Sequence, residues 1–179
     1  YLETINRQIK DIEKLVNEFS SFARMPRPVM KLVKIKDLIS RSFDLVKISS
    51  KNKLILKDKT DNEKIKVDEE QLNRVFINLI KNSEESLTEK AQKVANFNGK
   101  IEIEITNNNH YIVIKISDNG IGISDIKKAM NPYFTTKPKG TGLGLPIINK
   151  IINEHSGELV VTNNRKMDGV KIEILLPRN

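Results

Sequence analysis

The sequence predicts an α/β protein, a two-layer sandwich of helices on a sheet, preceded by one long helix. Residues 101–106 and 111–117 alternate apolar and polar side chains, as half-buried strands do. Residues 145–154 and the segment after Asp68 instead repeat apolar side chains at helical spacing. Because each kind of element must bury its apolar face, this set of strands and helices indicates two packed layers.

The composition is that of one globular domain with an appendage. The chain has 179 residues, of which 38% are hydrophobic and 30% are charged. It has no cysteine, which excludes disulfides and thiolate metal sites, and no apolar run near the ~20 residues that span a bilayer. No secretory signal pattern is present. Since the chain begins with Tyr1 rather than Met, we expect it to be a fragment of a longer protein.

The formal charge of +8 raises the question of an anionic partner such as nucleic acid. Lysines alternate with acids, however, as in Lys100–Glu104, and the few aromatic residues are not interleaved with a basic segment. Bases would therefore find little to stack on. We interpret many lysines as solvated surface, expect no nucleic acid binding, and keep a few lysines near the glycine clusters as candidates for phosphate.

Residues 1 to about 24 are predicted to form a long amphipathic helix. Its apolar residues follow a heptad pattern, at Ile5, Ile9, Ile12, Val16, Phe19 and Ala23. One helix cannot bury such a stripe alone, so a partner helix is expected, and packing onto the domain that follows is the alternative. Pro26 and Pro28 then end the helix in extended backbone.

The segment after the prolines is predicted to alternate short strands with a helix. A short strand is expected at 32–35, and Asp37 is expected to cap a helix that runs to about Ser49. Two further short strands are predicted at 53–57 and 64–67.

Asp68 is expected to cap a strong helix. The apolar face of this helix consists of Leu72, Val75, Phe76, Leu79 and Ile80. The helix also carries Asn78 and Asn82, which are one turn apart and therefore lie on one face.

The second half of the chain is predicted to supply the main sheet. Asn107–Asn109 would form the turn between the two alternating strands. The segments 158–162 and 170–176 would close the sheet as a second hairpin.

A helix is predicted between these hairpins, over residues 145–154. Pro146 is acceptable in its first turn, where its missing N–H group has no partner to lose. Gly157 is expected to end the helix.

Asp118 stands at the end of a predicted strand and is followed by Gly120 and Gly122. A carboxylate there can accept a hydrogen bond from an exocyclic amine, and the glycines let the backbone approach a flat ring closely. Asn119-Gly120 is also a good turn dipeptide, so the motif taken alone leaves an ordinary turn as the alternative.

A second glycine cluster, Gly140-Thr141-Gly142-Leu143-Gly144-Leu145, leads into the predicted helix. Backbone N–H groups at a helix N-terminus form an anion site, to which Lys137 and Lys139 can add charge. The dinucleotide pattern G-x-G-x-x-G does not fit, because the third glycine comes one residue early. The phosphate-loop pattern G-x-x-x-x-G-K-[ST] is absent.

The two asparagines of the Asp68 helix are the third candidate group. The amide oxygen of Asn82 is a ligand that Mg²⁺ accepts while keeping several waters, and Asn78 is placed to reach phosphate or metal-bound water. Asparagine inside a helix is mildly unfavourable, so two on one face require a reason. Hydrogen bonding to a neighbouring loop is the alternative.

Taken in order, these motifs resemble a known family. They are Asn78-x-x-x-Asn82, Asp118-x-Gly120-x-Gly122, Pro132-Tyr133-Phe134-Thr135-Thr136-Lys137 and the cluster Gly140–Leu145. The set is similar to the N, G1, F and G2 boxes of the catalytic ATP-binding domain of sensor histidine kinases, over roughly residues 30–177. Residues 18–26, Glu-Phe-Ser-Ser-Phe-Ala-Arg-Met-Pro, are similar to the second dimerisation helix of nitrogen-regulation sensor kinases of the NtrY type.

The resemblance implies a Bergerat fold that holds Mg²⁺ and ATP under a lid formed by residues 124–139. Asp118 would bind the adenine amine, Asn82 would hold Mg²⁺, and lid closure would order the γ-phosphate for transfer. The expected catalytic residues are Asn78, Asn82 and Lys137. The other expected nucleotide-binding residues are Gly120, Gly122, Phe134, Thr135, Thr136, Gly140, Thr141, Gly142, Leu143, Gly144 and Leu145.

Asn78 discriminates within the superfamily. Hydrolytic relatives of the gyrase type resemble this pattern but carry a glutamate one turn before the metal-binding asparagine, where it activates water. Asn78 is not a base, so we expect slow intrinsic ATP hydrolysis. A hydrolytic ATPase or a kinase for protein serine stays open as an alternative, as does a non-catalytic nucleotide-sensing module.

The resemblance also divides the chain and names its partners. Residues 1–25 would be the second helix of a dimerisation hairpin, 26–29 a linker, and 30–179 the catalytic domain. It implies a homodimer through the first helix, a response-regulator receiver domain as a partner, and a cytoplasmic location. Parent proteins of the NtrY type are usually anchored in the inner membrane.

The chain departs from the family at the phosphoacceptor. Its histidines are His110, beside the 107–109 turn, and His155, at a helix end. Neither has an H-E-x-x-x-P context on the heptad helix, so we interpret both as structural or surface residues. The chain is therefore expected to bind ATP without phosphorylating its own histidines.

Overall fold

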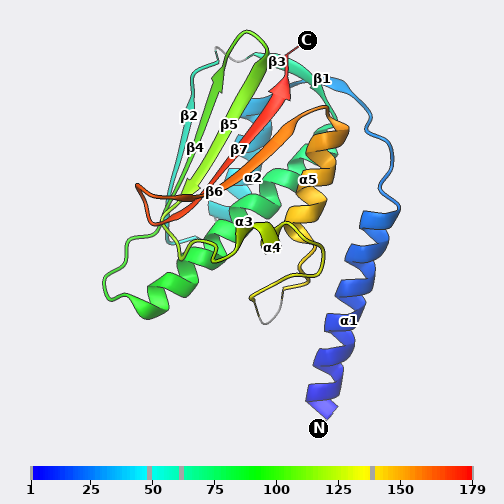
Figure 1. Cartoon of the computed structure of the whole chain (residues 1–179), viewed down its shortest axis with the longest axis vertical. Helices are drawn as coiled ribbons and strands as arrows, with labels where there is room; N and C mark the ends of the chain where they lie inside the picture. Colours follow the sequence, from blue (N-terminus) through cyan, green and yellow to red (C-terminus); the bar gives the residue numbers. More distant parts are fainter. Residues whose placement is uncertain (1, 48–49, 61–62, 138–139, 179) are drawn as a thin grey trace.

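A sheet covered on one face by helices forms the body of the protein, and a long helix stands beside it (Figure 1). This computed structural model describes residues 2–47, 50–60, 63–137 and 140–178. The helices are α1 (Leu2–Ala23), α2 (Ile35–Lys47), α3 (Glu69–Lys93), α4 (Ile126–Ala129) and α5 (Gly144–Glu154). The strands are β1 (Lys31–Lys34), β2 (Lys53–Asp58), β3 (Lys64–Val67), β4 (Lys100–Asn107), β5 (Tyr111–Asp118), β6 (Glu158–Asn164) and β7 (Gly169–Pro177). The predicted two-layer sandwich is confirmed.

The main sheet has the strand order β2-β4-β5-β7-β6. The two predicted hairpins are present, because β4 pairs antiparallel with β5 and β6 pairs antiparallel with β7. The sequence did not predict which sheet the other three strands join. β2 joins the main sheet parallel to β4, whereas β1 and β3 pair with each other in a separate two-stranded sheet.

The core lies between the main sheet and α2, α3 and α5 (Figure 1). Alternate isoleucines of β4 and β5 point into it, since Ile103 and Ile116 stand opposite each other and are both buried. From α3 the core receives the predicted apolar face, Leu72, Val75, Phe76, Leu79 and Ile80, all of it fully buried. Burial of this apolar area is the main favourable term in folding.

Charged side chains interleave on the other side of the sheet. Lys100 and Lys57 both contact Glu102, at 2.7 and 2.5 Å, and these contacts lower the pKa of the Glu102 carboxyl to about 2. Lys115 and Lys171 contact Glu173 in the same manner. Many of the lysines that give the chain its positive charge therefore lie among acids at the surface, as their alternation predicted.

The start of α3 anchors the linker that follows α1. Asp68 caps α3 as predicted, since its carboxylate accepts a hydrogen bond from the Gln71 N–H at 2.9 Å. The same carboxylate accepts from the Val29 N–H at 2.7 Å, and the Gln71 side chain donates to the Pro26 carbonyl at 2.9 Å. These contacts hold the extended linker against the start of α3.

The apolar stripe of α1 stays exposed, at Ile5, Ile9, Ile12, Val16 and Phe19. Packing of this stripe onto the following domain, the alternative left open by the sequence, is therefore not what the structure shows. Figure 1 shows α1 projecting away from the sheet. Among the helices of the described residues, none is both long and apolar enough to cross a membrane.

The predicted N-cap of α2 is wrong. Asp37 does not cap α2, because the helix begins at Ile35 directly after β1 and places Asp37 in its first turn. An acid there still interacts favourably with the helix dipole. The helix ends at Lys47, and the predicted end near Ser49 lies outside the described residues.

Gly157 is not the left-handed residue that ends α5. Ser156 takes that conformation, with φ of 55°, and its N–H donates to the Asn153 carbonyl. The Gly157 N–H donates to the Ile152 carbonyl at 2.9 Å, which completes a Schellman motif. Position 157 requires glycine for a steric reason, because a Cβ there would lie 2.5 Å from the Leu175 carbonyl oxygen.

The left-handed Ser156 gives a first prediction. Replacing Ser156 with Gly removes the steric cost of a Cβ in this conformation, and this outweighs the added freedom of the unfolded chain. We expect Ser156→Gly to raise the free energy of unfolding by about 0.5–1 kcal/mol in urea titration. Ser156→Ala keeps the Cβ and serves as the control, and an equal gain in that variant would contradict the explanation.

Candidate functional site

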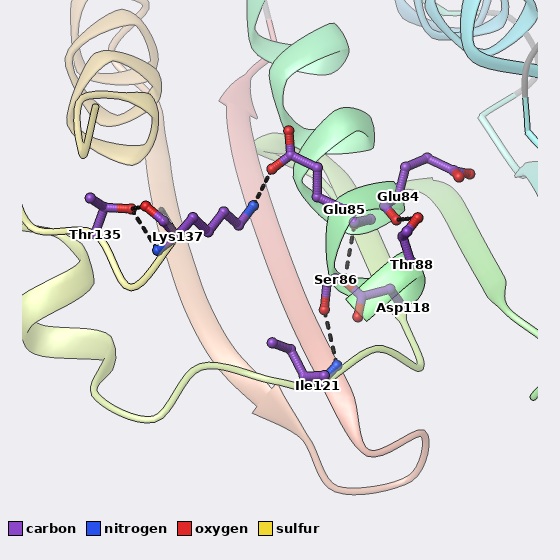
Figure 2. A network of polar contacts seen from close by, with 9 residues as sticks. Glu84, Glu85, Ser86, Thr88, Asp118, Ile121, Thr135 and Lys137 are labelled. Atoms are coloured by element: carbon purple, nitrogen blue, oxygen red, sulfur yellow. Dashed lines mark hydrogen bonds and ion pairs between the residues drawn. The ribbon is translucent and has the colours of Figure 1, made fainter. Parts of the chain in front are cut away.

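The predicted motifs converge on the C-terminal half of α3, which faces the end of β5, the lid segment and the start of α5. Figure 2 shows this region, with residues of α3 reaching toward Ile121, Lys137 and Asp118. The convergence brings together residues that are separated by more than fifty positions in the chain, such as Glu85 and Lys137, which form an ion pair.

Asp118 is the buried acid of the site, at 3% exposure. Its Oδ1 accepts hydrogen bonds from the N–H groups of Gly120 at 2.9 Å and Val170 at 3.2 Å, and its Oδ2 accepts from the Ser83 hydroxyl at 3.0 Å. Burial raises the pKa of Asp118, although these donors and the charge of Lys90 oppose the increase. Oδ1 is fully engaged, whereas Oδ2 keeps acceptor capacity for a further donor.

One face of α3 holds the loop that follows Asp118. Ser86 accepts a hydrogen bond from the Ile121 N–H at 3.0 Å (Figure 2). Lys90 donates to the carbonyls of Asn119 at 2.9 Å and Gly120 at 3.0 Å. Ser83, Ser86 and Lys90 are three and four residues apart, so they share one helix face. The contacts from this face hold the loop close to α3.

The predicted glycines of this loop are used in different ways. A Cβ at Gly120 would lie 2.1 Å from the Ser86 hydroxyl, so Gly120 allows the loop to approach α3. Gly122 has a φ of 76°, a conformation that favours glycine. The next residue is clamped from β6, because Asn163 accepts from the Ile123 N–H and donates to the Ile123 carbonyl.

Gly169 and Val170 contribute to the site and were not predicted. They open β7, and the Val170 N–H reaches Asp118 as described above. A Cβ at Gly169 would lie 2.2 Å from the Asp118 carbonyl oxygen, so only glycine allows this approach. These two residues reach Asp118 because β5 pairs with β7 in a register that places Ser117 opposite Lys171. This register cannot be predicted from the local sequence, so the two residues were missed.

Asn82 faces the second glycine cluster. A Cβ built on Gly144, the first residue of α5, would have the Asn82 amide nitrogen 3.8 Å away. The side-chain amide of Asn82 and the N-terminus of α5 therefore face the same space. Asn78, one turn earlier, is half-buried. Leu143 is fully buried in the core, so any contact from it to a ligand is made by its backbone.

The predicted lid segment contains a short helix that was not predicted. Asp125 caps α4 by accepting from the Lys128 N–H at 3.0 Å. Beyond it, Tyr133 has a φ of 68° and donates its N–H to the Gly142 carbonyl at 3.1 Å. A Cβ at Gly142 would lie 2.7 Å from the Phe134 N, so the backbone of Tyr133 and Phe134 packs directly on the second glycine cluster.

Lys137 extends from the lid segment to α3. Its Nζ forms an ion pair with Glu85, and Figure 2 shows this bridge beside the loop after Asp118. Its backbone N–H donates to the Thr135 hydroxyl at 3.1 Å, and Thr135 and Thr136 are exposed. Lys139, also considered for phosphate, lies outside the described residues.

Both histidines have the structural or surface positions expected of them. His110 is exposed at the turn between β4 and β5. His155 is buried, with its Nδ1 2.8 Å from the Ile151 carbonyl and its Nε2 accepting from the Asp68 N–H at 2.9 Å. His155 therefore ties the end of α5 to the start of α3.

A surface hollow lies at the N-terminal end of α3, away from these motifs. Its lining includes Val29, Leu38, Arg41, Leu45 and Asn73. None of the predicted site residues lines it. The candidate site is therefore the convergence around Asp118, Asn82 and Gly144, where polar groups from several elements face one another.

Comparison with known proteins gives a family match over most of the chain. The family described as histidine kinase-, DNA gyrase B-, and HSP90-like ATPase matches residues 67–179. A putative sensor histidine kinase, NtrY-like, from Rickettsia felis is 35% identical over 177 residues, which cover 97% of this chain and 28% of that relative. The chain thus spans less than a third of the length of this curated relative.

Solved structures agree in fold. The catalytic domain of histidine kinase ThkA in a nucleotide-free form has a TM-score of 0.72 and 26% identity, over 84% of this chain and 98% of that one. Histidine kinase ThkA in complex with the response regulator protein TrrA has a TM-score of 0.78 and 22% identity, over 100% of this chain and 51% of that one.

The contact between Ser83 and Asp118 gives the second prediction. Ser83→Ala leaves a buried carboxylate oxygen without a donor, so we expect the free energy of unfolding to fall by about 1–3 kcal/mol at neutral pH. The donor stabilises the ionised form, and the loss should therefore shrink as pH falls through the raised pKa of Asp118. Urea titration at several pH values measures this.

Thr88→Ala is the control for Ser83→Ala, because the exposed Thr88 hydroxyl donates only within its own helix, to the Glu84 carbonyl. We expect it to change the free energy of unfolding by less than about 0.5 kcal/mol. A loss in Ser83→Ala that is independent of pH would show that the hydroxyl does not act on the carboxylate.

Proposed function

Because this chain belongs to the family of histidine kinase-, DNA gyrase B- and HSP90-like ATPases, we propose that it is the ATP-binding catalytic part of a two-component sensor histidine kinase. The parent protein would transfer the γ-phosphate of ATP to a histidine and then to an aspartate of a response regulator. The names of the similar proteins support this class, and the site supplies the chemistry.

The observation that carries the proposal is the free acceptor capacity of the buried Asp118 carboxylate. Gly120 and Val170 occupy Oδ1, so a ligand amine would be accepted by Oδ2 beside Ser83. A buried charged acceptor paired with an exocyclic amine gives a strong and selective hydrogen bond. The loop after Asp118, held close to α3, would cover one face of the adenine ring.

The phosphate end of the site would lie between Asn82 and the start of α5. Backbone N–H groups at the N-terminus of α5 suit an anion, and Gly144, the first residue of α5, places no side chain there. The amide oxygen of Asn82 is a suitable Mg²⁺ ligand, with the remaining positions filled by phosphate and water. Bound Mg²⁺ would neutralise part of the negative charge of the phosphates. Asn78 would orient metal-bound water or phosphate from the preceding turn.

Transfer to a protein acceptor, rather than hydrolysis, fits the residue types of α3. Asn78 and Asn82 occupy neighbouring turns of one helix face, and neither can accept a proton from water at neutral pH. Phosphoryl transfer depends on positioning and charge stabilisation, which the α5 N-terminus, Asn82 and Lys137 would provide. The histidine that accepts the phosphoryl group would belong to another segment of the parent protein, and would be neither of the two histidines of this chain.

The remaining parts of the proposal concern partners. The exposed heptad stripe of α1 supports residues 1–25 as half of a dimerisation hairpin, joined by the linker 26–29 to the catalytic domain 30–179. A similar kinase was solved with a response regulator, which supports a receiver domain as the partner of the parent protein. We propose a cytoplasmic location for this catalytic part, with a parent of the NtrY type anchored in the inner membrane.

Calorimetric titration with Mg²⁺ and a non-hydrolysable ATP analogue tests the pocket through Asp118→Asn. The Asn side chain keeps the Gly120 and Val170 donors on Oδ1 and presents an NH₂ group to Ser83 and to adenine. We expect affinity to fall by about 10- to 100-fold, as for loss of a hydrogen bond to a charged group.

The same variant should not lose stability. Burial raises the pKa of Asp118, so its ionisation lowers the free energy of unfolding as pH rises through that pKa. Asp118→Asn removes this cost, and we expect it to be at least as stable as the wild type at pH 7. Unchanged nucleotide affinity in a folded variant would contradict the assigned pocket.

A kinase should use ATP for transfer and hydrolyse it slowly. With radiolabelled ATP and Mg²⁺, we expect label to move to a separately supplied helical hairpin that carries an acceptor histidine, and no stable label on this chain. Asn82→Ala should reduce the transfer rate at least ~10-fold, because the metal ligand is lost. Fast Mg²⁺-dependent hydrolysis by the chain alone would favour the hydrolytic class, and binding without transfer would favour a nucleotide-sensing module.

A further inference from the structure

One ion pair joins the lid segment to the helix that carries Asn82. Lys137 extends from the lid and contacts Oε2 of Glu85 on α3 (Figure 2). Glu85 follows Asn82 by three residues, so the two side chains lie on neighbouring turns of the same part of the helix. The ion pair therefore links the lid segment to the helix that carries the proposed metal ligand.

The neighbouring acids of α3 have different partners. Glu84 accepts from the Ser50 hydroxyl and from the Asn52 amide, each at 2.7 Å, and so holds the segment before β2. Glu89 pairs with Lys93 one turn further along the same helix. Glu85 is thus the acid of this group whose partner belongs to the lid.

The charge of Lys137 is the one that the proposed function assigns to the phosphates of ATP. In the structure, this charge is already paired with Glu85. Both side chains are accessible, with exposed fractions of 36% for Lys137 and 60% for Glu85, so their pairing is weakened by water and salt. A triphosphate carries more negative charge than one carboxylate and would compete well for the same ammonium group.

We propose that Glu85 is a positioning residue that holds Lys137 across the site and releases it to the phosphates when ATP binds. This inference rests on the proposed function, since it requires ATP to occupy the site. Nucleotide binding would then exchange one partner of Lys137 for another. The ion pair would lower the apparent affinity for ligands whose phosphates reach Lys137, and would leave ligands without phosphates unaffected.

Glu85→Gln tests the proposal by calorimetric titration of the full chain with a non-hydrolysable ATP analogue and Mg²⁺, and with adenosine. Because breaking an exposed ion pair of this kind costs little free energy, we expect Glu85→Gln to gain about 1.5- to 5-fold in affinity for the ATP analogue. Adenosine affinity should stay unchanged, which also shows that the variant is folded. Glu89→Gln removes the same charge from the same helix and should leave both affinities unchanged.

The double variant Glu85→Gln/Lys137→Gln separates this mechanism from simple repulsion between Glu85 and phosphate. If Glu85 acts through Lys137, adding Glu85→Gln to Lys137→Gln should produce no further gain in affinity. An equal gain in both backgrounds would overturn the proposal, as would a single Glu85→Gln variant with unchanged or weaker ATP affinity. Failure of the wild type to bind the ATP analogue would instead overturn the proposed function, and this inference with it.

Discussion

Asp118 ends β5 beneath α3, and its buried carboxylate accepts hydrogen bonds from the glycine loop, from β7 and from α3. Gly120, Val170 and Ser83 supply these donors, so the carboxylate fixes three elements relative to one another. Gly169 must lack a side chain for the β7 contact to form. The adenine end of the proposed site is therefore determined by one acid whose burial is unfavourable for its charged form.

α3 connects this acid to the rest of the protein. Its start is fixed by Asp68, which anchors the linker from α1 through Val29, and by His155 at the end of α5. Its last turns hold the loop after Asp118 and, through Glu85, the lid. Because α3 has one end on the linker and the other at the candidate site, it physically connects α1 with the proposed nucleotide site.

The sequence predicted what local patterns control. Alternating isoleucines located β4 and β5, the heptad stripe located α1, and Asp68 was identified as a helix cap because that role needs only a few neighbouring residues. Positions that depend on long-range packing were missed. Ser83 and Lys90 look like surface residues of a helix until the loop after Asp118 is placed above them, and Gly169 becomes important only through the pairing of β5 with β7. Gly157 was expected to end α5, and its N–H does complete the Schellman motif. The left-handed residue of that motif is Ser156, however, and close packing against β7 is what requires glycine at position 157.

The most direct test of this account is a crystal structure of the chain with Mg²⁺ and a non-hydrolysable ATP analogue. The account predicts the adenine amine within hydrogen-bonding distance of Asp118 Oδ2, the metal on the Asn82 amide oxygen, and the phosphates at the N-terminus of α5. A nucleotide bound elsewhere, or bound with Asp118 contacting only protein groups, would contradict it.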